Sequence, residues 1–388
     1  MKRVFLIILD SFGIGALPDA GQYGDQGSDT LAAIRKSSFF SASNLAKLGL
    51  FHIDGVSPIP GQSGKFSGCI ARMGEVSCGK DTVIGHWEIG GIQSPKPFPT
   101  YPQGFPADFC EEFSRRTGRG ILCNRPYSGT EVLTAYGKRH VETGDLIVYT
   151  SADSVCQIAA HEDVIPVEEL YRYCGIAREM LGVGRVIARP FQGDESGYER
   201  TPRRRDFALE PPGDTILDCL KRAGYDTVSV GKIRDIFAGR SISREFHTRD
   251  NAEGMECTAA LAEEEFNGLC FVNLVDFDMK YGHRNDVDGY AAAVSRFDVW
   301  LGDFLSGLGK EDLLMITADH GCDPSTPSTD HSREYAPLLA WGPSLKPGVN
   351  LGTRQSFSDT GKTILEYFDV PNSLPGVSFW KEIQKEKR

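Results

Sequence analysis

The sequence has no apolar run long enough to cross a bilayer, since none approaches the roughly 18–20 apolar residues that a transmembrane helix requires. The apolar run at residues 4–9 is short, Asp10 follows it at once, and no small-residue cleavage site closes it. We therefore expect a buried strand there and not a signal peptide. Positive charge is also outnumbered: 42 Lys and Arg residues against 53 Asp and Glu residues give a formal net charge of −11. This charge argues against nucleic-acid binding but does not exclude an anionic small substrate.

Paired cysteines are absent as well. The ten cysteines are scattered without a C-x-x-C pair or a regular interval. In a chain of 388 residues this favours reduced thiols over a disulfide framework, and it disfavours a structural zinc site. We therefore expect a cytoplasmic protein, with no membrane contact and no obligate protein partner implied. With 40% hydrophobic and 24% charged residues, the composition is that of a globular protein large enough for two or three domains.

Short apolar runs that end at polar or glycine-rich loops alternate with amphipathic stretches in the later part of the chain. The apolar runs lie at residues 4–9, 145–150, 227–232, 269–277 and 313–318, and the amphipathic segments at residues 214–224 and 289–308. In the second amphipathic segment, Val294, Phe297 and Leu301 recur at helical spacing. This alternation predicts an α/β fold with a largely parallel sheet flanked by helices.

Two proline-rich passages, at residues 93–106 and 208–214, bracket a middle section whose own patterns mix helix and strand. A section that leaves and returns through stiff, non-helical connections is typical of an inserted domain. We therefore predict a metal-binding catalytic core domain formed by residues 1–97 and 214–388, and a smaller inserted α+β cap domain at residues 98–213.

Acidic and imidazole side chains follow three of the predicted strands. Asp10 follows the first, Asp276 and Asp278 follow a later one, and Asp319 follows the last. Three of the eight histidines fall in the last two of these loops, namely His283, His320 and His331. Each piece alone is more simply a helix cap, a turn or a satisfied structural histidine. Together, beyond the carboxyl ends of strands, they predict a site for hard or borderline divalent ions such as Mn²⁺ or Zn²⁺.

Three aspartates and three histidines can supply two ions with three protein ligands each, which leaves coordination positions open for a substrate. Two ions roughly 3.5–4 Å apart stabilise the attacking and leaving oxygens of an in-line phosphoryl displacement. Thr82 is the candidate nucleophile, because it lies in a glycine-flanked polar stretch where a helix could begin and bind phosphate. The simpler alternative for Thr82 is a helix N-cap hydroxyl. His86 is a candidate for a supporting contact.

The segments KDTVIGHWE, DFDMKYGHRND and TADHGCDPSTPSTDHSREYAPLL, together with the aspartate that ends the first strand, resemble the alkaline-phosphatase superfamily. Within it, the chain is similar to the bacterial, metal-dependent phosphopentomutase family over nearly its whole length. The resemblance implies an alkaline-phosphatase-like core, phosphorylation of Thr82 and two metal ions, with manganese as the metal. The metal ligands that it implies are Asp10, Asp278, His283, Asp319, His320 and His331. It thereby selects Asp278 over Asp276, which spacing alone leaves open.

The resemblance also implies the reaction, which interconverts α-D-ribose 1-phosphate and D-ribose 5-phosphate, and the 2-deoxyribose pair, in nucleoside and pentose phosphate metabolism. The implied intermediates are phosphothreonine and a sugar bisphosphate. Such a site must hold two phosphates and exclude water, so we expect the cap domain to act as a lid. By resemblance, Arg204 and Asp153 are the cap residues expected to contact the substrate. The simpler alternatives are a solvated surface arginine and a turn residue.

The main alternative is another member of the same superfamily: a phosphatase, a phosphodiesterase or a cofactor-independent phosphoglycerate mutase. Threonine at position 82, where that mutase is expected to carry serine, and the shorter insert favour the pentomutase. A non-catalytic metal- or nucleotide-binding protein is expected to have lost a ligand or the nucleophile, whereas all seven positions are filled. A dinucleotide motif fails at Pro18, and a Walker A motif fails at Ile59 and Phe66.

Overall fold

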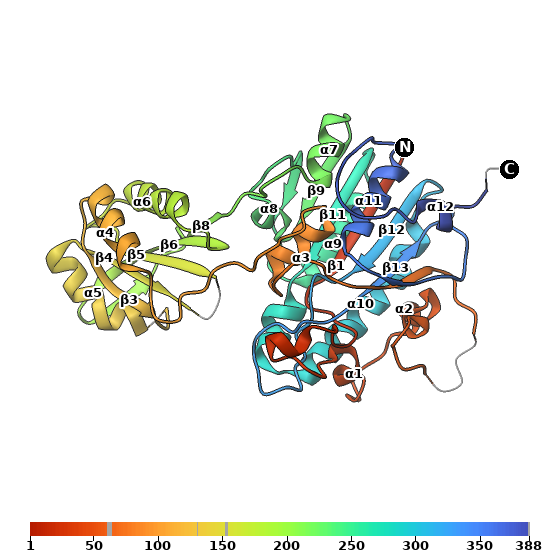
Figure 1. Ribbon diagram of the computed structural model, residues 1–388, viewed down its shortest axis with the longest axis horizontal. Coiled ribbons are helices and arrows are strands. Elements are labelled where there is room, and N and C mark those ends of the chain that lie inside the picture. Colours follow the sequence, from red (N-terminus) through yellow and green to blue (C-terminus); the bar gives the residue numbers. More distant parts are fainter. Residues whose placement is uncertain (60–63, 130, 152–153, 387–388) are drawn as a thin grey trace. The chain divides into compact units, whose positions relative to one another are not determined.

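In the computed structural model the chain forms two compact units (Figure 1). The core unit consists of Met1–Pro97 and Pro211–Arg388, and the insert unit consists of Phe98–Glu210. The residues that the structure describes are 1–59, 64–129, 131–151 and 154–386.

The core unit is built on an eight-stranded sheet with the strand order β10-β9-β11-β1-β12-β13-β2-β14. Its strands are β1 (Arg3–Leu9), β2 (Cys69–Met73), β9 (Asp226–Val230), β10 (Arg244–Phe246), β11 (Gly268–Leu274), β12 (Asp312–Thr317), β13 (Ala336–Trp341) and β14 (Val349–Arg354). β13 runs antiparallel to both of its neighbours, and the other adjacent pairs are parallel. The largely parallel sheet predicted from the sequence is therefore confirmed.

Two groups of helices flank the core sheet (Figure 1). One group consists of helices that pack on one another, namely α3 (Thr82–Ile89), α7 (Ile216–Arg222), α8 (Ile233–Ile236) and α11 (Ser358–Tyr367). The other group consists of α1 (Thr30–Ile34), α2 (Ser43–Leu48), α9 (Asn251–Glu263) and α10 (Val287–Gly307). Shorter helical segments are Ala20–Tyr23, Leu50–His52, Gly282–Arg284 and α12 (Trp380–Ile383). Because both faces are covered, the central strands are near-continuous apolar runs.

The central strands β1, β11 and β12 end at the same edge of the core sheet. Leu9 pairs with Leu274 of β11, and Ile8 pairs with Thr317 of β12. Every residue of β11 and β12 is buried. Because parallel strands present their carboxyl ends on one edge, the residues that follow these three strands lie next to one another there.

The insert unit has its own six-stranded mixed sheet, in which the path β3-β4-β5-β6-β7 is joined by β8, paired with β6. Its elements are α4 (Ala107–Thr117), β3 (Ile121–Pro126), α5 (Glu131–Thr143), β4 (Leu146–Thr150), β5 (Val155–His161), α6 (Val167–Met180), β6 (Arg185–Asp194), β7 (Gly197–Arg200) and β8 (Arg205–Ala208). Leu146 and Val148 pack with α4 and α6, whereas Ile147 and Tyr149 pack with α5. The alternation of β4 therefore supplies a small core on each face of the sheet.

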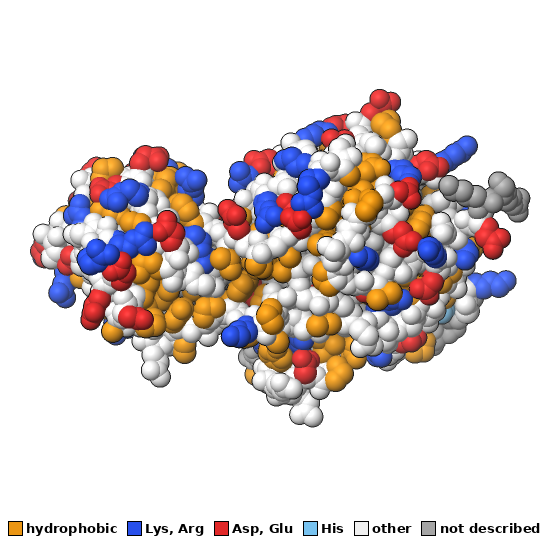
Figure 2. Space-filling view, turned by 45° about the horizontal axis from the view of Figure 1, so that its top comes forward, with side chains coloured by type: hydrophobic (Ala, Val, Ile, Leu, Met, Phe, Trp, Pro, Cys, Tyr) orange, Lys and Arg blue, Asp and Glu red, His pale blue; other side chains and the backbone are white. Residues whose placement is uncertain are grey.

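The surface carries charges of both signs. On the face shown in Figure 2, Lys and Arg side chains are interspersed with Asp and Glu side chains over each unit. The net charge of −11 is therefore not gathered into one acidic patch on this face. Among the described residues, no helix combines the length and the apolar character needed to cross a membrane.

Candidate metal centre

Three buried aspartates meet beyond the carboxyl ends of the central strands. Asp10 directly follows β1, Asp319 lies shortly after β12, and Asp278 lies in a π-helix, Phe277–Tyr281, that follows β11. The side chains of Asp10 and Asp319 are fully buried, and the exposed fraction of Asp278 is 4%. Burying three carboxylates together is unfavourable unless cations or hydrogen-bond donors compensate their charge. The π-helical turn is itself a rare feature that occurs frequently at functional sites.

The two aspartates that spacing left open, Asp276 and Asp278, have different surroundings. The apolar run at residues 269–277 forms a strand only in its first part, because the chain then turns into the π-helix. Oδ2 of Asp276 accepts hydrogen bonds from the backbone N–H of Asn251 and from Nζ of Lys280, both at 3.0 Å. Asp278 instead faces the histidines that were singled out in the sequence.

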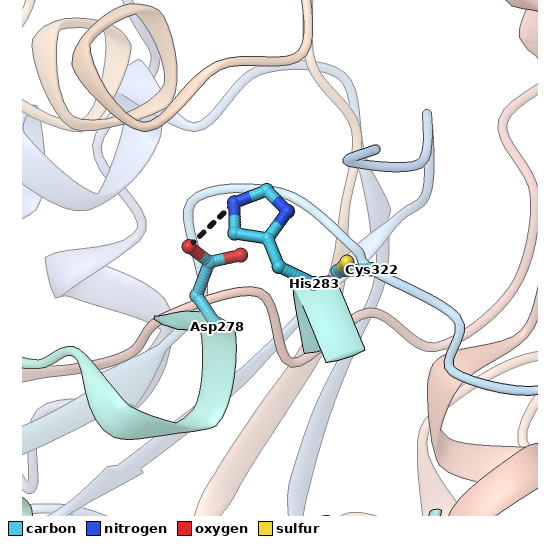
Figure 3. Close-up of side chains that lie close together, drawn as sticks. All are labelled: Asp278, His283 and Cys322. Atoms are coloured by element: carbon cyan, nitrogen blue, oxygen red, sulfur yellow. Dashed lines mark ion pairs between the residues drawn. The ribbon is translucent and has the colours of Figure 1, made fainter. Parts of the chain in front are cut away.

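The six predicted ligands form one continuous cluster. Its overlapping groups, in each of which the ligand atoms lie within 4.8 Å of one another, are Asp10 with Asp319 and His320, Asp278 with His320 and His331, and Asp278 with His283 and Cys322. Nε2 of His283 lies 3.2 Å from Oδ2 of Asp278 (Figure 3). Nε2 of His331 lies 3.3 Å from Oδ1 of the same carboxylate. His320 joins the first two groups, so no predicted ligand lies apart from the others.

The three histidines present the same ring nitrogen to the cluster. Nδ1 of each ring lies 2.7–3.0 Å from a backbone carbonyl oxygen. The carbonyl belongs to Thr329 for His283, to Gly321 for His320 and to Lys80 for His331. A ring that donates its Nδ1–H to a carbonyl has its lone pair on Nε2. The Nε2 atoms of His283 and His331 lie 3.1 Å apart, so a proton or a cation must lie between them.

The charges of the cluster are not balanced by its own hydrogen bonds. Oδ1 of Asp10 and Oδ1 of Asp278 are buried and accept no hydrogen bond from the described residues. Burial, reinforced by Asp319 and Asp278, raises the pKa of Asp10 well above its usual value. Burial opposes protonation of His331, yet the charge of Asp278 raises the pKa of that imidazole to about 10. A divalent cation would satisfy both the carboxylate oxygens and the imidazole lone pairs, so these residues fit a metal site.

Thr82 is the first residue of α3 and lies beside the cluster. The side chain of Asp81 caps this helix by accepting hydrogen bonds from the backbone N–H groups of Val83 and Ile84, each at 3.1 Å. The N-cap role considered for Thr82 is therefore filled by Asp81. Oγ1 of Thr82 instead lies 3.1 Å from Nε2 of His320, the histidine shared by two of the groups.

A buried arginine fixes the loop that leads to Thr82. Arg333 forms ion pairs with Asp19 and Glu75. It also donates hydrogen bonds to the backbone carbonyls of Glu75, at 3.0 Å, and Gly79, at 2.7 Å. Sequence reasoning missed Arg333 because its partners are distant in the chain. The available signal was its position two residues after the last predicted ligand.

Cys322 also escaped prediction. Figure 3 shows the His283 ring turned towards Asp278, with Cys322 beside the backbone of His283. Burial, reinforced by Asp278, raises the pKa of the Cys322 thiol far above its usual value. Its Sγ also donates a hydrogen bond to the backbone carbonyl of Asp330, at 3.5 Å, so the thiol forms part of the wall of the cluster. Its signal in the sequence was its place directly after the Asp-His-Gly triplet.

Of the two substrate-contacting residues expected in the insert, Asp153 lies outside the described residues. Arg204 donates two hydrogen bonds to Asp206, each at 2.7 Å. Burial, reinforced by the charges of Arg204 and Arg200, lowers the pKa of the Arg189 guanidinium. Ala188 of β6 pairs with Arg205 of β8, so Arg189 lies beside the arginine-rich stretch. Sequence reasoning missed Arg189 because it lies on β6, apart in the sequence from the arginine-rich stretch.

Comparisons with known proteins cover the whole chain. Residues 2–372 match the family model described as the metalloenzyme superfamily. A phosphopentomutase of Lachnoclostridium phytofermentans is 61% identical over 390 residues, which cover 100% of both chains. One of Carboxydothermus hydrogenoformans is 54% identical over 392 residues, with 99% of this chain and 100% of the relative covered. One of Caldanaerobacter subterraneus subsp. tengcongensis is 53% identical over 390 residues, with 99% and 98% covered.

Proposed function

The chain belongs to the metalloenzyme superfamily and, within it, to the phosphopentomutase family, and from this we infer that it interconverts α-D-ribose 1-phosphate and D-ribose 5-phosphate, and the 2-deoxyribose pair. It is an isomerase that uses divalent metal and acts on a small sugar phosphate. The observation that carries this conclusion is 61% identity to a phosphopentomutase over the full length of both chains. A cytoplasmic location stays a prediction.

We propose that the clustered side chains hold two divalent ions, and that the metal is manganese. Asp10, Asp319 and His320 would hold one ion, and the other would be held by Asp278, His283 and His331. When bound, such ions supply positive charge that stabilises phosphoryl oxygens and favours the ionised form of a nearby hydroxyl. The convergent Nε2 atoms and the carboxylate oxygens without hydrogen bonds support this proposal.

We propose that Thr82 carries the phosphoryl group. Transfer to the sugar phosphate forms a bond between phosphorus and a sugar hydroxyl oxygen as the bond from phosphorus to Oγ1 of Thr82 breaks, which gives the 1,5-bisphosphate. Overall, the proton of that sugar hydroxyl passes to Oγ1. Transfer of the other phosphoryl group back to Oγ1 restores phosphothreonine and releases the isomer. The position of Oγ1 supports this role, because it lies 3.1 Å from Nε2 of His320, the histidine shared by two groups of the cluster. The loop fixed by Arg333 would keep Oγ1 in a reactive geometry.

We propose that Arg204 and Asp153 contact the sugar phosphate. The grouping of Arg204 with Arg189 and Arg200 supports the assignment of Arg204, because several guanidinium groups together attract an anion. Arg204 presents the Nε and Nη2 edge of its guanidinium to the carboxylate of Asp206, and arginine binds phosphate oxygens in the same bidentate geometry.

Phosphorus NMR distinguishes a mutase from a hydrolase. The Mn²⁺-loaded protein, primed with a sugar 1,5-bisphosphate, is incubated with α-D-ribose 1-phosphate, and the phosphorus signals are followed over time. We expect D-ribose 5-phosphate to accumulate with little inorganic phosphate, and we expect Thr82→Val, a variant of similar shape without the hydroxyl, to form neither. If inorganic phosphate were the main product, the protein would be a phosphatase of the same superfamily, and the proposal would fail.

A further inference from the structure

His86 is a fully buried histidine that the proposed reaction leaves unused. It lies on α3, one helical turn after Thr82, and its Nδ1 lies 2.9 Å from the carbonyl oxygen of Thr82. Oδ2 of Asp319 lies 3.0 Å from the same nitrogen. Because both neighbours are oxygens, Nδ1 carries the hydrogen, donates it to the Thr82 carbonyl and stays in electrostatic contact with Asp319. One imidazole N–H therefore lies between the helix of the nucleophile and a proposed metal ligand.

Asn273, in β11, extends this contact to Asp10. Its Nδ2 lies 2.7 Å from Oδ2 of Asp10 and 3.3 Å from Nε2 of His86, and all three side chains are buried. A carboxylate oxygen only accepts hydrogen bonds, so the end of the Asn273 amide that faces Asp10 is the NH₂ group. Its second hydrogen is then available to the lone pair on Nε2 of His86, in agreement with a hydrogen on Nδ1.

Close packing leaves these side chains little room to rearrange. A Cβ atom added to Gly85 would lie 2.1 Å from the backbone oxygen of Asp319, so α3 lies directly against the loop that carries this aspartate. The ring of His86 also stacks on Phe271, with 5.9 Å between the ring centroids. In a close-packed interior, side chains held in this way have one arrangement and transmit a displacement to their neighbours.

The geometry points to His86 and Asn273 as positioning residues of the metal centre, a role that rests on the proposed metal ligands Asp10 and Asp319. As a bridge, the two residues together link Asp10 to the first turn of α3 by hydrogen bonds, and they hold the imidazole of His86 against the carboxylate of Asp319. Outer partners of this kind fix the orientation of metal ligands, and their loss lowers metal affinity by about 10–100-fold. The bridge therefore sets the metal affinity of the group formed by Asp10, Asp319 and His320, and places Thr82 relative to that group.

Paired substitutions separate this role from simple packing. His86→Asn keeps an amide N–H near the place of Nδ1, whereas His86→Leu has a similar size and no donor. Asn273→Leu removes the link to Asp10. Mn²⁺ binding to the full-length variants is measured from the paramagnetic resonance signal of the free ion. We expect His86→Leu and Asn273→Leu to weaken the binding of one ion by about 10–100-fold, and His86→Asn to weaken it by less than about tenfold.

His140→Leu is the matched control. His140 is also fully buried and hydrogen-bonded at both ring nitrogens, to the carbonyl of Asp145 at 2.6 Å and to the backbone N–H of His161 at 2.8 Å, but it lies in the insert unit. This variant should unfold at a lower temperature and bind Mn²⁺ as the wild type does. Wild-type Mn²⁺ affinity in His86→Leu, or equal losses of Mn²⁺ affinity in His86→Asn and His86→Leu, would overturn the proposed role of the bridge and leave the proposed metal ligands in place. Failure of the wild-type protein to bind Mn²⁺ would overturn the proposed metal ligands and the bridge together.

Discussion

The core and insert units expose their functional candidates to solvent very differently. In the core, Asp10 and Asp319 are fully buried, and the histidines around them are each fixed by a backbone carbonyl. In the insert, the side chain of Arg204 is 44% exposed and pairs with Asp206. Buried groups that are fixed in position before the substrate binds can stabilise the transition state of the chemical step. Exposed ion pairs contribute little to stability and can exchange partners. We therefore expect core substitutions to affect catalysis or stability, and insert substitutions to affect mainly substrate binding.

The largest effect is expected at Thr82. In Thr82→Val, phosphoryl transfer should fall by at least about 10³-fold, because no hydroxyl remains to carry the phosphoryl group. Mn²⁺ content should stay close to that of the wild type, because the six clustered side chains are unchanged. Phosphorus NMR measures the first quantity and elemental analysis the second. Full turnover in this variant would remove Thr82 from the mechanism.

Removal of the metal should destabilise the core unit and leave the insert unit unchanged. Chelation should abolish turnover and lower the stability of the core, because free metal at 100 times its dissociation constant contributes about 2.7 kcal/mol to a protein that binds it only when folded. Hydrogen exchange read by mass spectrometry should show faster exchange in β11 and β12 and unchanged exchange in β4 and β5 of the insert. Equal loss of protection in both units would contradict the placement of the metal in the core.

The sequence predicted that these core side chains would cluster, because the ends of the strands can be recognised in it. Asp10 directly follows an apolar run, Asp319 follows one that contains a single polar residue, Thr317, and parallel strands bring such positions to one edge. The choice of Asp278 over Asp276 needed the family resemblance, since the π-helix that turns Asp278 towards the histidines has no signature in the spacing.

Long-range contacts between charged or polar side chains could not be predicted from the sequence. Arg333 pairs with residues more than 250 positions away, and Asn273 looks like one more residue of a buried strand until the fold places it against Asp10. Arg189 likewise lies near the arginine-rich stretch only because the sheet of the insert pairs β6 with β8. Hydrophobic periodicity indicates which face of an element is buried, and it carries no information about which polar side chain that face contacts.

A smaller effect is expected from Glu334, a buried carboxylate that accepts hydrogen bonds from Thr30, Ser332 and the backbone N–H of Gly15. Burial raises its pKa from 4.5 to about 7. Because the pKa in the folded state is the higher one, its contribution to stability is fully present below pH 4.5 and is lost as the pH rises through about 7. Denaturant unfolding at several pH values should show this loss, on the order of 3 kcal/mol, in the wild type and not in Glu334→Gln. If the free energy of unfolding varied with pH in the same way in both proteins, Glu334 would not be the source of the loss.

The smallest effect is expected in the insert. Arg204→Ala should raise the KM for the sugar phosphate by about tenfold and change kcat little, because a bidentate contact to a non-reacting phosphate is present in the ground state and the transition state alike. Arg204→Lys keeps the charge without the planar fork and should fall between the alanine variant and the wild type. The free energy of unfolding should change by no more than about 0.5 kcal/mol in either variant. A fall in kcat at unchanged KM would place Arg204 in the chemical step and erase the contrast between the units.

Anomalous diffraction from crystals grown with Mn²⁺ tests the central claim most directly, since it locates the metal independently of the protein coordinates. The account predicts two anomalous peaks roughly 3.5–4 Å apart, one against Asp10 and Asp319 and the other against Asp278 and His331, with Oγ1 of Thr82 beside the pair. A single peak, or peaks remote from Thr82, would contradict it.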